Sequence, residues 1–270
     1  MDWADKRQRY IDAILLNCNG DWPDLEGLIR DIYVAYLQKS DVVMDVGVNH
    51  GTHLFQMAEA VGETGHVIGI EAVPAHVAAV QALMEGPYSH LADRIVMHSC
   101  AVSHSPGKAE FFVSKANDGC LSGLQLRDIL AKNEIEKIEV DVRTIDQIAD
   151  GDTNVCFIKI DVEGAEFDAL SGAVNILKHR PVIVFEFDDT APPAFNFSPS
   201  DFLDLFAHNR LKVFDLFGFP VESPDALMTA RVWNFVAVPT EVDGMAITAP
   251  ARRTLEKQFP SLKELEPASG

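Results

Sequence analysis

Carboxylates follow two apolar runs in the second half of the chain, and a carboxylate can take the proton from a reacting hydroxyl. Asp161 and Glu163 come directly after the run 155–160, and Glu186 ends the next apolar run. We interpret Asp161 as a catalytic residue beside the molecule that carries the reacting hydroxyl, which we call the acceptor. Glu163 and Glu186 would shape the pocket for this acceptor. A capping role stays equally open for Glu163. Glu166 is assigned to the following helix, whose dipole favours acids in its first turn.

Carboxylate oxygens are also the ligands that Mg²⁺ prefers in proteins. Carboxylates at strand ends are nevertheless common without a metal, so we predict that the site holds no metal ion. The residues that would otherwise offer ligands are Asp161, Glu163, Glu186, Asp188 and Asp189.

A glycine turn forms the other candidate site. From Asp45 onward the sequence DVGVNHG joins an apolar run to a helical pattern. Gly47 lets the backbone bend sharply and approach a ligand, and Gly51 lets the helix pack closely on the sheet. Asn49 tolerates positive φ better than most residues, so the turn is preserved. The N–H groups at the helix start favour an anion, such as the carboxylate of a methionine moiety.

Glu71 ends the apolar run 66–70, roughly 20 residues past the glycines, where a carboxylate can accept hydrogen bonds from both ribose hydroxyls of a nucleoside. A nicotinamide dinucleotide motif that starts at Gly47 would need glycine at Asn49 and Thr52, and a phosphate-binding loop would need Gly-Lys before Ser or Thr. Both patterns are missing. The glycines could also form a tight turn without a ligand, an interpretation that Glu71 disfavours.

Two histidines and a lysine accompany these segments. His50 lies on the turn and is a candidate general base, because imidazole titrates near neutral pH. His53 is better explained as a residue on the face of the following helix. Lys159 alternates within the run 155–160 and is expected to pair with a nearby acid.

From Asp41 onward, apolar runs without polar alternation are separated by helical patterns. Such runs are typical of strands covered on both faces, as in a parallel sheet with crossover helices. We therefore predict an α/β fold with a doubly wound, Rossmann-like sheet. The predicted strands are 42–46, 66–70, 94–98, 155–160 and 182–187, and the predicted helices are 52–61, 75–84 and 165–178.

Further segments extend this core. Residues 109–113 and 137–142 are predicted strands of an insertion, which includes the small, polar loop 114–123. Residues 211–216 and 231–238 are predicted to form a closing hairpin at the sheet edge. Helical spacing within 5–38 predicts two short helices. We divide the chain into an N-terminal helical extension (1–40), a main domain (41–240) and a polar C-terminal tail (241–270) that we expect to fray.

The overall composition narrows the partners. The chain has 22 basic and 41 acidic residues and a formal net charge of −19, which would repel a nucleic-acid backbone. Its four cysteines form no CxxC pair, and no apolar stretch is long enough for a signal peptide or a membrane span. We predict a reduced, soluble, cytoplasmic protein that binds neither nucleic acid nor membrane. The sequence leaves the oligomeric state open.

Two groups of motifs resemble the FkbM family of S-adenosylmethionine-dependent methyltransferases. The first joins DVGVNHG at Asp45 to GIEAVP at Gly69, and the second joins FIKIDVEGAE at Phe157 to LSGA and RPVIVFE further on. The segments AVS at Ala101 and PG at Pro106 also look like the family. The resemblance covers residues 41–240. The sequence departs from the family pattern at Ser99 and His104, which affects the expected contacts to adenine.

The resemblance implies a class I methyltransferase fold that uses S-adenosyl-L-methionine and methylates oxygen on sugars or natural products. Four residues of the first motif would line the methionine side of the cofactor, Glu71 would bind its ribose, and Ala101 would lie near its adenine. Those four are Asp45, Gly47, Asn49 and Gly51.

We predict O-methylation of a small hydroxyl acceptor. A SAM-binding or assembly protein without turnover is the alternative, and an NAD-dependent oxidoreductase fits less well. The N-terminal helices and the loops 114–123 and 188–199 are expected to contact the acceptor.

Overall fold

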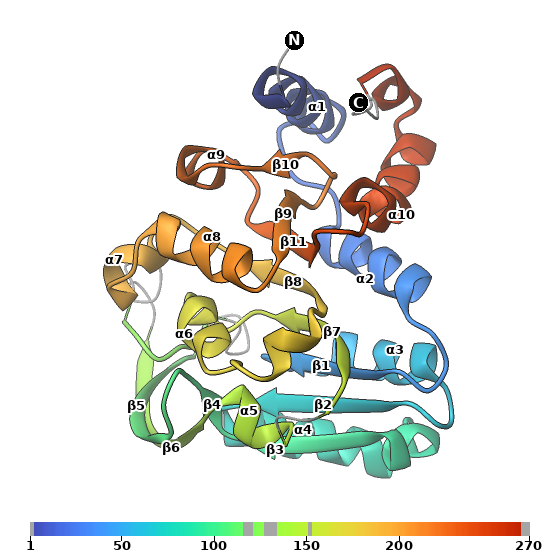
Figure 1. Cartoon of the computed structure of the whole chain (residues 1–270). Helices are drawn as coiled ribbons and strands as arrows, with labels where there is room; N and C mark the ends of the chain where they lie inside the picture. The colour runs from blue at the N-terminus through green and yellow to red at the C-terminus, as the bar shows by residue number, and fades with distance from the viewer. Residues whose placement is uncertain (1–2, 116–120, 127–133, 151–152, 266–270) are drawn as a thin grey trace.

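A mixed sheet of eight strands forms the centre of the computed structural model, which describes residues 3–115, 121–126, 134–150 and 153–265 (Figure 1). Its strand order is β10-β9-β11-β8-β7-β1-β2-β3. The bounds are β1 Val42–Val46, β2 His66–Glu71, β3 Ile95–Ser99, β7 Val155–Ile160, β8 Val182–Glu186, β9 Leu211–Asp215, β10 Pro220–Val221 and β11 Asn234–Pro239.

Strand β1 marks the point where the chain changes direction across the sheet. It pairs in parallel with β2 on one side and with β7 on the other. The strands that follow extend outward from there, β3 beside β2 and β8 beside β7. In open α/β sheets, ligands bind at the carboxyl ends of the strands beside such a switch point. The predicted doubly wound fold is confirmed.

Helices cover both faces of this sheet, α3 on one side and α6 with α8 on the other (Figure 1). Their bounds are α3 Thr52–Val61, α4 Pro74–Glu85, α6 Glu166–Ser171 and α8 Pro199–His208. The central strands β1, β7 and β8 are buried along nearly their whole length, which explains why their sequences show apolar runs rather than alternation.

The helix predicted over 165–178 is wrong in its length. The chain forms α6 and then a separate 3₁₀ helix, Ile176–His179. A Cβ on Gly172 would come within 2.3 Å of the Ser103 carbonyl oxygen, so this point of the chain is pressed against a neighbouring segment. The Asp146 carboxylate, in helix α5 (Ile145–Ile148), accepts the N–H groups of Asn175 and Ile176. These long-range contacts replace the helical hydrogen bonds.

The insertion forms a small sheet of its own in the order β4-β6-β5, beside the carboxyl ends of β1 and β2 (Figure 1). Its strands are β4 Ala101–Val102, β5 Gly107–Ser114 and β6 Ile135–Arg143, so both predicted strands are confirmed. It packs a second apolar cluster against the large sheet, made of Val73, Ala101, Phe111, Val140 and Val142.

The predicted closing hairpin is partly wrong. Strands β9 and β11 do pair antiparallel. However, β11 lies between β8 and β9, and the short β10 occupies the edge. The central position suits β11, because all of its residues are buried. Two short helices complete this region, α7 Ala191–Phe195 and α9 Pro224–Met228.

Helices at both ends of the chain pack on the same core. The two predicted N-terminal helices are confirmed as α1 Trp3–Asn17 and α2 Leu25–Tyr36. The expected fraying of the tail is wrong for residues 244–265, which form α10 Gly244–Gln258 and a 3₁₀ helix, Pro260–Leu265. Leu255 and Leu262 are fully buried there, which anchors the segment. The three-part division of the chain stays a prediction.

No helix in the described part of the chain combines the length and apolar character that a membrane crossing requires.

Candidate active site

The turn after β1 has three residues in the left-handed region: Gly47 with φ +87°, Asn49 with φ +49° and Gly51 with φ +83°. Asn49 therefore adopts the positive φ that its residue type was predicted to tolerate. Gly47 carries the tightest constraint, because a Cβ there would lie 1.8 Å from the carbonyl oxygen of Asp161. The N–H of Asp161 also donates to the carbonyl of Val46 at 2.9 Å. The turns after β1 and β7 thus touch through their backbones.

Glu71, at the end of β2, holds two of these segments together. One carboxylate oxygen, Oε2, accepts the N–H of Asn49 at 2.8 Å, and Oε1 accepts the N–H of Val73 at 2.8 Å. The side chain of Glu71 is 8% exposed, and Nδ1 of His76 lies 3.7 Å from Oε1. An ionised carboxylate offers about four lone-pair sites, so each oxygen keeps capacity for a hydroxyl donor.

A pocket of about 610 Å³, partly open to solvent, lies between these segments and the small sheet. Four predicted cofactor residues and two predicted catalytic residues contribute to its wall: Gly47, Asn49, Glu71 and Ala101, and Asp161 and Glu163. The backbone of Glu163 is itself left-handed, with φ +57°. The geometry therefore brings together the two halves of the predicted site.

Three of the predicted site residues are not among those that line the pocket. Asp45 lies within β1 and is 1% exposed. Gly51 lies at the start of α3, where a Cβ would come 2.8 Å from the ring of Phe55, so it serves the packing of this helix. His50 is exposed, and its ring centroid lies 5.1 Å from that of His76.

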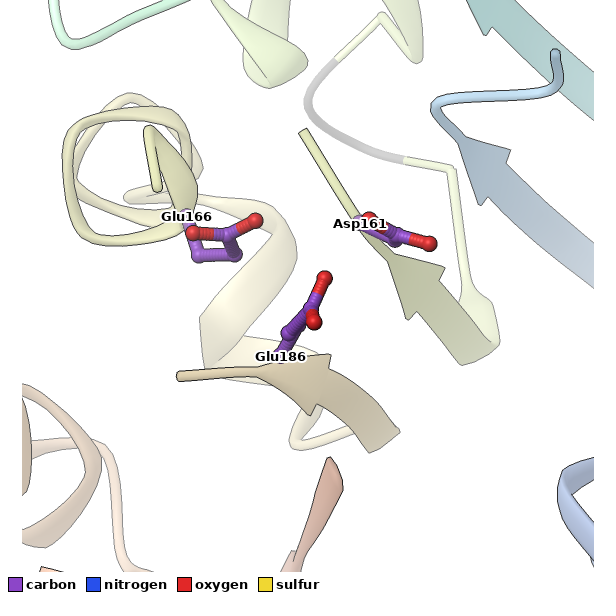
Figure 2. A group of neighbouring side chains, drawn as sticks. All are labelled: Asp161, Glu166 and Glu186. Atoms are coloured by element: carbon purple, nitrogen blue, oxygen red, sulfur yellow. The ribbon is translucent and has the colours of Figure 1, made fainter. Parts of the chain in front are cut away.

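Asp161, Glu166 and Glu186 form a cluster of carboxylates at the ends of β7 and β8 and the start of α6. One oxygen from each lies within 4.8 Å of the others. Figure 2 shows the carboxylate of Glu186 extending between the other two. Glu166 is 2% exposed, and its Oε1 accepts the N–H groups of Val162 and Gly164. Glu166 therefore holds the turn after β7, in line with its predicted structural role.

The cluster distributes its charge unevenly. Burial opposes ionisation of Asp161, but the Lys159 ammonium and a hydrogen bond with Glu186 outweigh it and hold the pKa of Asp161 below its usual range. Burial and the adjacent charge of Asp161 raise the pKa of Glu186 well above its usual range. The surroundings therefore favour the ionised form of Asp161 and the protonated form of Glu186.

The same carboxylates are close enough to share a cation. We assign no metal ligands here, and the absence of a metal requirement stays a prediction.

The sequence predicted only part of what the insertion contributes to the pocket. Ser122, from the loop 114–123, lines it, and so do Phe111, Leu124 and His76 on α4, which were not predicted. The apolar alternation of β5 marks Phe111 as facing a buried surface, but nothing local identifies that surface as the pocket. The loop 114–123 was expected to contact the acceptor, and its residues 116–120 lie outside the described part of the chain.

Comparison with protein families shows which family the chain belongs to. The profile of the methyltransferase FkbM domain matches residues 45–214, which is more than half of the chain. The chain belongs to the FkbM methyltransferase family. This confirms the predicted resemblance, and S-adenosyl-L-methionine is the methyl donor of the family. A comparison with curated proteins gave no match.

Solved structures similar to this FkbM-family chain are also methyltransferases or bind a cofactor. The FkbM methyltransferase from Methylobacillus flagellatus is 22% identical with a TM-score of 0.47, and the match covers 74% of this chain but only 44% of that protein. Cofactor-bound Rv0187 from MTB is 12% identical with a TM-score of 0.45, and the match covers 87% of this chain and 91% of that protein. An O-methyltransferase from Bacillus cereus in complex with SAH is 13% identical with a TM-score of 0.43, and the match covers 85% of this chain and 90% of that protein.

We predict that Gly47→Ala destabilises this FkbM-family protein by roughly 3 kcal/mol or more, because the new Cβ collides with backbone in a left-handed turn. Urea unfolding measures the change. Gly107→Ala is the matched control, because a Cβ at Gly107 meets nothing within 4 Å. Equal stability of the two variants would show that the two turns do not touch as described.

A second prediction concerns pH. Burial raises the pKa of Glu166 to about 7, although the hydrogen bond from the Val162 N–H acts to lower it. A carboxyl whose pKa is raised by folding stabilises the protein below its unfolded pKa, and this contribution is lost as pH rises through the folded pKa. The free energy of unfolding should therefore fall between about pH 5 and about pH 8, and less steeply in Glu166→Gln. Urea titrations across this range test it, and identical slopes in both proteins would contradict it.

Proposed function

We propose that this chain transfers the methyl group of S-adenosyl-L-methionine to a hydroxyl oxygen of a small acceptor, a sugar or a natural product. The observation that carries the proposal is one pocket with Glu71 on one wall and Asp161, in contact with the Lys159 ammonium, on another. Glu71 can accept hydrogen bonds from the ribose of a nucleoside, and Asp161 can take the proton of a hydroxyl group.

The residues around the pocket fit the cofactor by chemistry. Gly47 and Asn49, in the turn before α3, would hold the methionine moiety, where helix N–H groups favour its carboxylate. Glu71 would accept the ribose hydroxyls through the lone pairs that its two backbone contacts leave free. Ala101 lies in the apolar cluster of the small sheet, a suitable wall for adenine. When bound, the cofactor supplies a methyl group on a sulfonium.

The chain's own task is then to orient the acceptor and take its proton, because methyl transfer is an in-line displacement that depends on alignment. Asp161 is the best candidate for the base, since it borders the pocket and the Lys159 ammonium favours its ionised form. Glu163 borders the same pocket and would contact the acceptor. His50 is exposed and outside the pocket wall, so we place it second to Asp161 as a base.

The acceptor class follows from the same groups. Carboxylates accept hydrogen bonds from hydroxyls and repel anions. Asp161 and Glu163 on the pocket wall therefore favour a neutral acceptor with several hydroxyl groups over a phosphorylated one.

Transfer of label from tritiated S-adenosylmethionine to a panel of sugars, macrolides and phenols tests this proposal. We expect at least one hydroxyl compound to be labelled, and Asp161→Asn to lower kcat by about 10²–10⁴-fold with little change in affinity for S-adenosylhomocysteine.

The control variant is Asp204→Asn, because Asp204 is an exposed carboxylate on α8. Binding of S-adenosylhomocysteine without labelling of any acceptor would favour the alternative of a SAM-binding protein without turnover. Full activity of Asp161→Asn would remove Asp161 from the role of base.

A further inference from the structure

Lys159 is a buried cation two residues before Asp161. Its side chain is 7% exposed, and Nζ donates to Oδ2 of Asp161 at 3.1 Å. Side chains two positions apart on a strand lie on the same face, so β7 directs both groups toward the same side of the sheet. An ammonium at this depth is costly unless anions surround it.

A second anion lies opposite Lys159 on the neighbouring strand. The register of β1 and β7 pairs Asp45 with Lys159. Asp45 is 1% exposed, and neither of its carboxylate oxygens has a hydrogen-bond partner among the described residues. Burial raises the pKa of Asp45, and Lys159 opposes this. Beyond Asp45, His53 on α3 contacts Glu26 on α2, with Nε2 and Oε2 2.5 Å apart.

On the other side, Asp161 meets Glu186. The parallel register of β7 and β8 ends with Ile160 beside Phe185, so the next residues of the two strands, Asp161 and Glu186, are aligned. Asp161 and Glu186 are each only partly exposed, and two carboxylates this close repel each other when both are ionised. Holding one proton between them relieves this repulsion, and the environment of the pair decides which residue carries it.

We propose that Lys159 is a positioning residue that fixes the negative charge of this carboxylate pair on Asp161 and leaves the proton on Glu186. The ammonium contacts Asp161 and His53 also favours the charge there, whereas the groups that act on Glu186 are acids. These acids are Glu166, the first residue of α6, and Glu163, in the turn between β7 and α6. Only Asp161 of the two lines the pocket, so the charge is kept where an acceptor hydroxyl would approach. This last step rests on the proposed function.

Carboxyl NMR titration of protein labelled with ¹³C at the aspartate carboxyls tests the proposal without any acceptor. The Asp161 signal is assigned by its loss in Asp161→Asn. We expect Asp161 to titrate below the ordinary aspartate range. In Lys159→Met the midpoint should rise by at least about one pH unit, because the ammonium that offsets much of the effect of burial is gone. Lys159→Arg keeps the charge and should restore a low midpoint.

An unchanged Asp161 midpoint in folded Lys159→Met would overturn the proposal. So would a lower midpoint for Glu186 than for Asp161 in glutamate-labelled protein. If Lys159→Met does not fold, the double variant Lys159→Met/Asp45→Asn removes one charge of each sign and is titrated in its place. A shifted midpoint without methyl transfer to any acceptor would reject the proposed function and leave the role of Lys159 intact.

Discussion

The contact between the turns after β1 and β7 is the constraint on which the site depends. At Gly47 the backbone passes so close to the carbonyl of Asp161 that no side chain fits between them. The contact places the turn before α3 and the carboxylates that follow β7 around one pocket. Glu71 then braces the turn from the β2 side through the N–H of Asn49. A nucleoside and an acceptor can meet at this edge because three strands end there together.

Electrostatics give the two walls of the pocket different properties. Glu71 accepts two backbone N–H groups, which keep it ordered and able to accept hydroxyl donors. Asp161 lies between a buried ammonium and a second carboxyl, an arrangement that favours its ionised form. Buried charges of this kind add little net stability, since desolvation offsets their attraction. Their value here is chemical, because they set which group can take a proton.

Much of the fold could be predicted from local pattern, because a doubly wound sheet buries its strands on both faces and leaves apolar runs in the sequence. The turn was also predictable: Asn49 and its neighbouring glycines have the residue types that left-handed backbone requires. Features that are set by contacts between residues far apart in the sequence could not be predicted from local pattern. The break at Gly172 depends on Ser103 and Asp146, and the ordered tail depends on the burial of Leu255 and Leu262.

The same distinction holds for the site. Glu71, Asp161 and Glu163 follow strands and were predicted, since strand ends at a switch point face ligands. The contributions of Phe111 and Leu124 arise from the docking of the small sheet, which no local pattern encodes. Asp45 belongs to the motif but is buried behind the pocket wall, where sequence spacing alone could not place it.

Calorimetric titration with S-adenosylhomocysteine tests the central claim most directly, with Glu71→Gln compared against wild type. Glu110→Gln serves as control, because Glu110 is an exposed partner of Lys137 on the small sheet. Loss of charge-assisted hydrogen bonds worth about 1.5–3 kcal/mol should weaken binding about ten- to hundredfold in Glu71→Gln and leave the control unchanged. Equal affinity of Glu71→Gln and wild type would contradict the account.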